Sequence, residues 1–253
     1  MKNKFLELFP VKKPVIGMIH LASHGKIPAT EQAQAELDIY EACGVDAAIV
    51  ENFFGLEEDV ASVLRNCMKY QRKIVLGVNV LPNEFNLSIP WASEYGARFV
   101  QLDYVAGRYI GNKELDLDSY LDVCERYPDI TVLGGVWPKY YTPIGSDLRK
   151  DLFDGAARAD AVVVTGTGTG QETPVRKIKA FRKILDEYAK GYPLVVGAGV
   201  TADNAREQLG LSDGAIIGSY FKKGDVRSEV AKENIERIMS IAAQARKQNY
   251  SAF

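Results

Sequence analysis

Short apolar runs alternate with amphipathic helical patterns along the whole chain, and this alternation limits the fold more than any other feature. Parallel strands are covered on both faces and read as continuous apolar runs, so the pattern predicts a parallel sheet with crossover helices. The predicted strands are 15–21, 45–51, 73–80, 98–103, 130–136, 161–165, 194–197 and 214–217. The predicted helices are 30–43, 56–70, 89–95, 117–127, 146–158, 173–190, one that begins after Thr201, and 227–246.

The number of repeats favours a closed barrel over a doubly wound sheet. The chain has 253 residues, close to the roughly 250 of one (β/α)8 barrel. We therefore predict an α/β fold, a (β/α)8 TIM barrel, as a single domain over 1–253. A short apolar segment, 5–9, is expected to cap the bottom of the barrel. Thr30 and Thr173 are predicted N-caps, the latter with Pro174 at the first helical position.

Composition argues against several partners. The net charge is −2, and lysine and arginine are spread along the chain, so nucleic acid and membrane surfaces are not expected partners. No apolar run approaches the roughly 20 residues of a membrane span, and the N-terminus lacks a signal-peptide pattern. Cys43, Cys67 and Cys124 lack metal-ligand spacing and predict free thiols in a cytoplasmic protein. Tyr250 and Phe253 are candidates for packing on a second subunit of a homo-oligomer.

Three glycine-rich turns follow apolar runs in the last third of the chain, at 166–170, 197–201 and 218–219. Glycine lets the backbone approach a ligand closely, and the last two loops of such a barrel commonly bind phosphate. The turns therefore predict a small phosphorylated ligand, held at Thr165, Gly166, Gly197, Gly199, Gly218 and Ser219. The first turn reads GxGxG after the sixth strand, which does not fit a dinucleotide fingerprint, so no cofactor is expected.

Polar residues stand where the predicted strands end, and barrel enzymes place their reacting groups there. Glu51 is a candidate general base or a loop anchor. Asp103 is a candidate base or hydroxyl ligand, or a partner of Arg98 or Arg108. His20 is a candidate acid or base, and with His24 it is a weaker candidate metal ligand.

Three further polar residues complete the predicted site. Asn79 and Asn83 follow the third strand and are candidates for binding substrate hydroxyls, although asparagine at a strand end also satisfies backbone groups. Lys139 follows Trp137 and Pro138 in an aromatic loop. It is a candidate nucleophile toward a carbonyl, an anion ligand, or a solvated loop residue. No metal is assigned.

Several of these segments together resemble one family over nearly the whole chain. The segments are GMIHL at 17–21, VENF at 50–53, GVNVLPN at 77–83, AVVVTG at 161–166, VGAGVTADN at 196–204 and DGAIIGS at 213–219. They resemble the BtpA/SgcQ family, a ribulose-phosphate-binding type of barrel. The resemblance implies the same fold, a link to photosystem I biogenesis in cyanobacterial members, and sugar metabolism, without a settled reaction, in bacterial ones.

The chain departs from the family pattern at several residues that are expected to carry the chemistry. Lys139 is kept after the fifth strand, but tyrosine follows where the family has histidine. The fourth strand ends Gln101-Leu102-Asp103 where the family has Arg-Val-Asn, and His24 replaces small residues. The anion site therefore carries over better than the reacting groups.

Three hypotheses remain open from the sequence. The first is an enzyme that isomerises, epimerises or cleaves a sugar phosphate, with Glu51, Lys139, Asp103 and His20 as its catalytic groups. The second is a non-catalytic assembly factor, which predicts no pocket of substrate size. The third is a metal-dependent hydrolase that uses His20 and His24.

Overall fold

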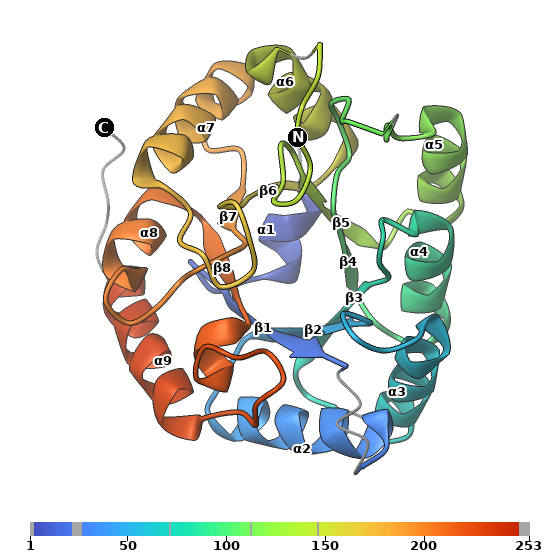
Figure 1. Cartoon of the computed structure of the whole chain (residues 1–253), viewed down its shortest axis with the longest axis vertical. Coiled ribbons are helices and arrows are strands. Elements are labelled where there is room, and N and C mark those ends of the chain that lie inside the picture. Colours follow the sequence, from blue (N-terminus) through green and yellow to red (C-terminus); the bar gives the residue numbers. More distant parts are fainter. Residues whose placement is uncertain (1–2, 22–26, 71, 112, 146, 248–253) are drawn as a thin grey trace.

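Eight parallel strands form a closed barrel in the computed structural model, which describes residues 3–21, 27–70, 72–111, 113–145 and 147–247. Each strand pairs with the next along the chain, and β8 pairs with β1 (Figure 1). The predicted (β/α)8 fold is confirmed. The strands are β1 (Val15–His20), β2 (Ala47–Glu51), β3 (Val75–Asn79), β4 (Phe99–Leu102), β5 (Thr131–Gly135), β6 (Ala161–Val164), β7 (Leu194–Val196) and β8 (Gly214–Ile217).

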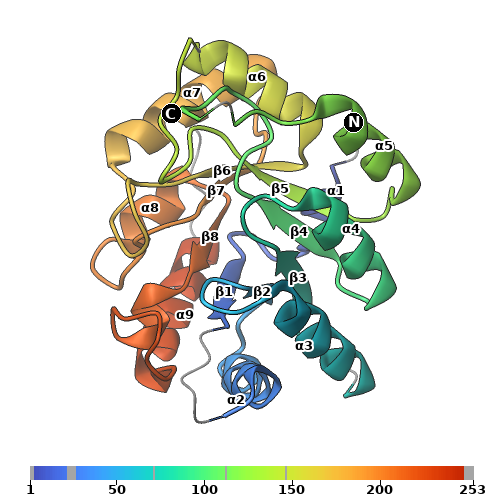
Figure 2. The same cartoon turned by 45° about the vertical axis from the view of Figure 1, so that its right-hand side comes forward.

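Helices surround this barrel as an outer ring (Figure 2). They are α2 (Ala29–Ala42), α3 (Glu57–Lys69), α4 (Phe85–Glu94), α5 (Leu117–Arg126), α6 (Leu148–Arg158), α7 (Val175–Tyr188), α8 (Ala205–Leu211) and α9 (Lys232–Lys247). A short helix, α1 (Lys4–Leu8), precedes β1, and a 3-10 turn, η1 (Ser219–Lys222), follows β8. None of the helices formed by the described residues combines the length and apolarity needed to cross a membrane.

Successive strand residues point alternately into the barrel and toward the helices, which explains the unbroken apolar runs. Ile16, Ile49 and Val163 belong to an inner cluster, whereas Val15 and Ile19 pack in a separate outer cluster that includes helix residues. The inner cluster also contains Phe5 and Phe9 of the N-terminal segment, and the Phe9 ring lies 5.8 Å from that of Phe99.

Two predicted helix starts are wrong in a similar way. The helix expected at 30–43 begins at Ala29 with Pro28 at the cap position, so Thr30 lies within the helix. The helix expected from Thr173 begins at Val175 with Pro174 as its N-cap. The Thr173 hydroxyl instead donates to the carbonyl of Ala198 at 3.0 Å, because the neighbouring loop offers it a buried acceptor.

Two other helices begin several residues away from their predicted starts. The helix predicted at 89–95 begins at Phe85 and contains Pro90. Phe85 packs edge-on against the Tyr120 ring at 5.6 Å, and this tertiary contact offsets the cost of an internal proline. The helix predicted at 227–246 begins at Lys232, since the carboxylate of Asp225 accepts the N–H of Arg227 in a turn. Tyr250, Phe253 and His24 lie outside the described residues.

A close contact between neighbouring strands constrains the lower barrel interior. Gly77 on β3 is opposite Phe99 on β4, and a Cβ on Gly77 would lie 2.3 Å from the Cζ of that ring. Since interiors are close-packed, there is no free space into which both groups could move.

We predict that Gly77→Ala lowers the free energy of unfolding by about 1–3 kcal/mol, because it overpacks this interior. Urea denaturation measures the change. Phe99→Leu is the matched second substitution, and the double variant should recover part of the loss. Strictly additive losses in the double variant would contradict the proposed contact.

Candidate active site

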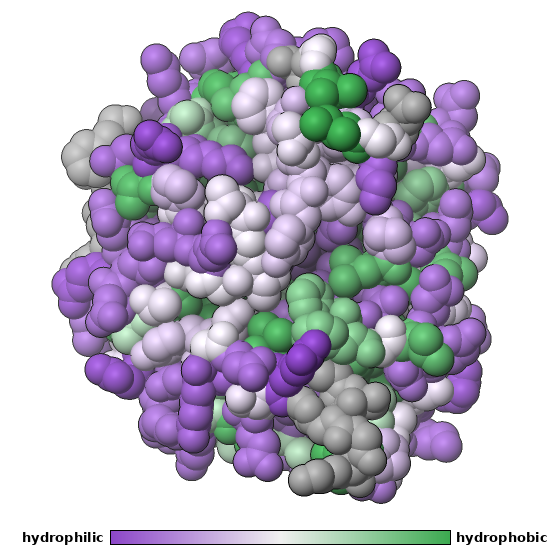
Figure 3. Space-filling view, viewed as in Figure 1, coloured by the Kyte–Doolittle hydropathy of each residue, from purple (hydrophilic) through white to green (hydrophobic). Residues whose placement is uncertain are grey.

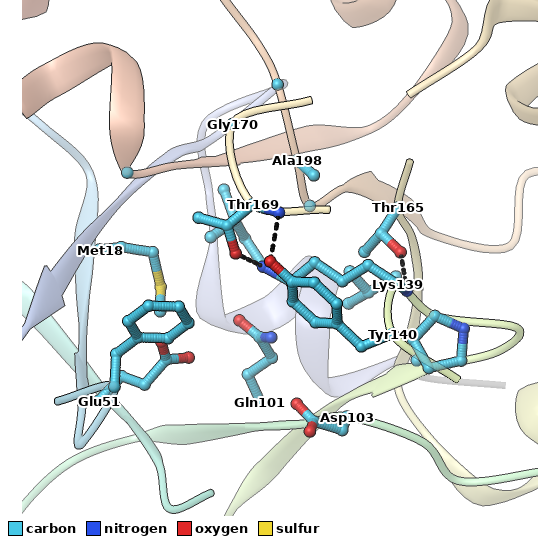
Figure 4. A pocket seen from close by; sticks show the side chains of 18 of the residues that line it. Met18, Glu51, Gln101, Asp103, Lys139, Tyr140, Thr165, Thr169, Gly170 and Ala198 are labelled. Atoms are coloured by element: carbon cyan, nitrogen blue, oxygen red, sulfur yellow. Dashed lines mark hydrogen bonds between the residues drawn. The ribbon is translucent and has the colours of Figure 1, made fainter. Parts of the chain in front are cut away.

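A cavity of about 580 Å³ opens at the carboxyl ends of the strands and is lined by residues that follow or end all eight of them. Of the residues singled out from the sequence, His20, Glu51, Asp103, Lys139, Thr165, Gly197, Gly199, Gly218 and Ser219 line it. Figure 4 shows several of these side chains around the cavity. Asn79 is fully buried immediately behind Glu51, while Asn83 and Gly166 are outside the lining.

Glu51 and His20 form a buried pair at the cavity floor. The Oε1 atom of Glu51 lies 3.7 Å from Nε2 of His20, and Oε2 accepts a 2.7 Å hydrogen bond from the side-chain amide of Asn79. Burial raises the pKa of Glu51 to about 7, against the opposing effects of the Lys139 charge and the Asn79 hydrogen bond. Burial lowers the pKa of His20 well below its usual range. Near neutral pH, His20 is therefore uncharged and Glu51 can both give and accept a proton.

Asp103 directly follows β4 and supplies a second, half-buried carboxyl group. Burial raises its pKa, while a hydrogen bond from the Tyr141 hydroxyl and the charge of Lys139 act in the opposite direction. The Tyr141 hydroxyl donates to Oδ2 at 2.9 Å. Neither Arg98 nor Arg108 forms an ion pair with Asp103 among the described residues, so the arginine pairing considered for it is not found.

The Lys139 side chain crosses the cavity toward the loop after β6. Its backbone N–H donates to Oγ1 of Thr165 at 2.7 Å, and its Nζ donates to Oγ1 of Thr169 at 2.9 Å (Figure 4). No carboxylate of the described ranges forms an ion pair with Lys139. The ammonium group therefore keeps hydrogen-bonding capacity for a ligand.

Glycine amides form the other side of the cavity. Within the described part of the chain, the backbone N–H groups of Gly199, Gly218 and Ser219 donate to no backbone or side-chain acceptor. The N–H of Gly197 differs, since it donates to the carbonyl of Val164 at 2.8 Å. Three of these four amides, those of Gly199, Gly218 and Ser219, thus remain available to an anion, which is a condition that a phosphate site requires.

The same glycines are also required by packing. Gly199 has a φ of +67°, and a Cβ there would lie 2.2 Å from the carbonyl oxygen of Gln171. A Cβ on Gly218 would lie 2.4 Å from Cε1 of His20. A Cβ on Gly166 would lie 2.7 Å from the carbonyl oxygen of Glu172, so glycine is required there by the packing of its own loop.

Asn83 has a role in positioning a loop. Its side-chain oxygen accepts the N–H of Tyr104 at 3.0 Å, and its side-chain amide donates to the carbonyl of the same residue at 3.1 Å. Both ends of the amide are therefore engaged with backbone, and the residue connects the loop after β3 to that after β4. Substrate binding by Asn83 is not supported by this geometry.

Sequence reasoning assigned no role to a buried ion pair behind the glycine turn. Lys222 ends η1 and is completely buried, and its Nζ lies 2.8 Å from Oε1 of Glu36 on α2. The same oxygen accepts a 2.8 Å hydrogen bond from Gln32, whose amide also donates to the carbonyl of His20 at 3.0 Å. These contacts fix the turn that carries Ser219 to α2 and to the end of β1. No sequence signal joins residues so far apart.

A second lysine missed from the sequence supports the loops. Lys177 on α7 donates to the carbonyls of Trp137 and Thr165 at 2.8 and 2.9 Å, and burial lowers its pKa to about 8. It thereby holds the ends of β5 and β6 together beneath Lys139.

Metal ligation was considered for His20 and His24. Among the described residues, no group of three or more histidine, cysteine or acidic side chains is arranged to hold a metal ion. His24 lies outside those residues.

The fold and the position of the cavity place the chain among (β/α)8 barrels with a site at the carboxyl ends of the strands. Solved structures of that fold include thiamine phosphate pyrophosphorylase from Pyrococcus furiosus, with a TM-score of 0.60, 14% identity, and coverage of 92% of this chain and 96% of the other. Another is phosphoribosyl anthranilate isomerase from Thermus thermophilus, with a TM-score of 0.61, 15% identity, and coverage of 91% and 98%.

The chain belongs to the BtpA family, whose model matches residues 11–244. It is 25% identical to the photosystem I biogenesis protein BtpA of Synechocystis, over 95% of this chain and 92% of that protein. It is 29% identical to an uncharacterized protein of Thermococcus kodakarensis, over 93% of this chain and 97% of the relative. The family resemblance predicted from the sequence is confirmed.

The raised pKa of Glu51 predicts a pH-dependent stability. The folded pKa of about 7 exceeds the ordinary value of 4.5. Between these two values the folded protein keeps a proton that the unfolded chain releases, so the unfolding free energy falls as pH rises, by up to about 3 kcal/mol. Glu51→Gln has no titrating carboxyl group at this position and does not lose this free energy. The unfolding free energy of the variant minus that of the unmodified protein should therefore be larger at pH 8 than at pH 5. Urea denaturation at both pH values measures the difference, and a constant difference would contradict the prediction.

The buried ion pair predicts a strong but compensable loss of stability. Lys222→Met leaves the carboxylate of Glu36 without its ammonium partner, at an expected cost of about 3–5 kcal/mol in unfolding free energy. Adding Glu36→Leu removes the carboxylate that has lost its ammonium partner and should restore most of the stability. Thermal and urea denaturation measure both variants. If the double variant were less stable than Lys222→Met, the pair would not be the reason for the loss.

Proposed function

We propose that this protein is an enzyme that binds a small phosphorylated metabolite, of the sugar-phosphate class, and transfers a proton on its carbon skeleton. The observation that carries the proposal is that Gly199, Gly218 and Ser219, whose N–H groups have no acceptor among the described residues, line the same cavity as Glu51 and Asp103. A dianionic phosphate satisfies such amides, and their fixed directions need no reorganisation on binding.

The groups opposite the amides suit chemistry next to a carbonyl. The Lys139 ammonium would polarise the carbonyl oxygen, and Glu51, with a pKa of about 7, would remove the proton from the adjacent carbon. Asn79 would hold the Glu51 carboxylate in position through its 2.7 Å hydrogen bond. Asp103 comes from a different strand and would serve a second proton transfer. Isomerisation, epimerisation and aldol cleavage all use such a base and such an electrophile.

The names of similar solved structures support the general class of substrate, a phosphorylated small molecule. The two solved barrels above carry phosphate compounds in their names, thiamine phosphate and phosphoribosyl anthranilate. Their low identity relates the folds and leaves the reaction of this chain open.

A second candidate function comes from the Synechocystis relative, which is named for photosystem I biogenesis. A non-catalytic assembly factor needs no cavity of substrate size. The 580 Å³ cavity with the carboxyl groups of Glu51 and Asp103 in its lining therefore favours the enzyme.

The phosphate contact is tested by a matched pair of substitutions at Ser219. Ser219→Asp places a carboxylate beside the unpaired amides, whereas Ser219→Asn has nearly the same size without the charge. We expect ribose 5-phosphate to bind Ser219→Asp at least about tenfold more weakly than Ser219→Asn, because like charges repel at this range. Isothermal titration calorimetry measures both affinities. Equal affinities, or no binding of ribose 5-phosphate or inorganic phosphate to the unmodified protein, would refute the proposed phosphate site.

A further inference from the structure

The two sides of the cavity differ in chemistry. The loops after β6, β7 and β8 contribute glycine, threonine and unpaired amides. The loops after β2, β3, β4 and β5 contribute the apolar or aromatic side chains of Phe53, Pro82, Ile110 and Tyr140. Figure 3 shows hydrophobic side chains gathered over the loops that follow β2 and β3, beside a paler band over the loop between β6 and α7. A ligand that fills the cavity therefore meets one side rich in glycine and threonine, and another side that carries apolar and aromatic surface beside Asp103, Lys113 and Lys139.

The cavity is also larger than a phosphorylated sugar requires. At about 30 Å³ for each water, its 580 Å³ corresponds to roughly 20 water molecules. A pentose phosphate has about 14 non-hydrogen atoms, and these pack more densely than water. Space remains beside the apolar side when the phosphate is on the glycine amides.

Tyr140 lines the cavity with an exposed ring. It is 65% exposed, although it lines the cavity, and its backbone has a φ of +68°, a strained value for an aromatic residue. Its hydroxyl accepts the backbone N–H of Thr169 at 2.8 Å, which fixes the direction of the ring (Figure 4). Strain of this kind persists only where surrounding contacts maintain it, and it occurs most often at functional sites.

Tyr141, the next residue of the same loop, differs from Tyr140 because its ring is packed against other aromatic rings. The Tyr141 ring packs on those of Tyr104 and Tyr109, at centroid distances of 5.2 and 5.5 Å. Among the described residues, the Tyr140 ring has no aromatic neighbour, and the Lys139 ammonium lies 5.8 Å from its centroid. The aromatic surface of Tyr140 is thus available to a ligand.

We propose that the ligand carries a planar aromatic ring in addition to its phosphate, and that this ring stacks on Tyr140. The inference rests on the proposed function for the phosphate end, and it adds the class of substrate: a sugar phosphate joined to an aromatic or heteroaromatic group. The phosphate binds at the amides after β7 and β8, the sugar lies over Glu51 and Asp103, and the ring lies against the apolar side.

The experiment compares probes that share a phosphate and differ in the ring. Ribose 5-phosphate, adenosine 5′-monophosphate and uridine 5′-monophosphate are titrated into the unmodified protein by calorimetry. Stacking of a base on an aromatic side chain strengthens binding by about 5- to 150-fold, so at least one nucleotide should bind about tenfold or more tightly than ribose 5-phosphate. If ribose 5-phosphate binds and neither nucleotide binds more tightly, the inference is overturned while the phosphate site stands.

A pair of variants tests the contribution of the ring itself. Tyr140→Phe keeps the aromatic surface and removes the hydroxyl, and Tyr140→Leu removes both the hydroxyl and the ring. We expect Tyr140→Phe to keep most of the preference for the nucleotide, and Tyr140→Leu to lose it, with ribose 5-phosphate bound about equally by the two. Circular dichroism confirms that both variants are folded. A preference that survives in Tyr140→Leu would show that Tyr140 is not the stacking surface.

Discussion

The closure of the barrel between β1 and β8 is the constraint on which the site depends. The two strands pair over Val15 to Gly17 and Ala215 to Ile217, and this pairing brings the first and last strand ends together. Gly218 thereby lies against the His20 ring, so closely that a Cβ would overlap Cε1 of the imidazole. Residues almost two hundred positions apart in the chain become neighbours through this pairing, which the side-chain contacts of Lys222, Glu36 and Gln32 support. The anion-binding amides and the buried acid–base pair share one cavity for this reason.

Burial gives the polar residues at the strand ends their chemical character. The walls of the barrel exclude water from Glu51 and His20, so both groups favour their uncharged forms. Lys139 acts in the opposite direction on Glu51, since its positive charge favours the carboxylate. The balance leaves Glu51 with a pKa near neutrality, which suits a group that must take up and release a proton in one cycle.

Supporting contacts outside the cavity position the groups inside it. Lys222 and Glu36 fix η1 to α2, and Lys177 connects the ends of β5 and β6. Lys222 is completely buried and pairs with Glu36 on a different element, and the half-buried Lys177 donates to carbonyls of two different loops, so each lysine holds two segments together. Such contacts explain how short loops after different strands keep a common geometry.

The sequence by itself determined the repeated strand and helix pattern, because the period of apolar residues is a local property that burial imposes on each segment. It also located the strand ends, and therefore predicted that Glu51, Asp103 and Lys139 lie together at the carboxyl ends of the strands. Helix starts at Phe85 and Lys232 were not predictable, since a contact with Tyr120 and a turn around Asp225 decided them. Only the tertiary structure decided which glycine amides stay unpaired, that the amide of Asn83 is used by Tyr104, and that Tyr140 presents its ring to the cavity. These facts depend on contacts between segments far apart in the chain, which no local pattern records.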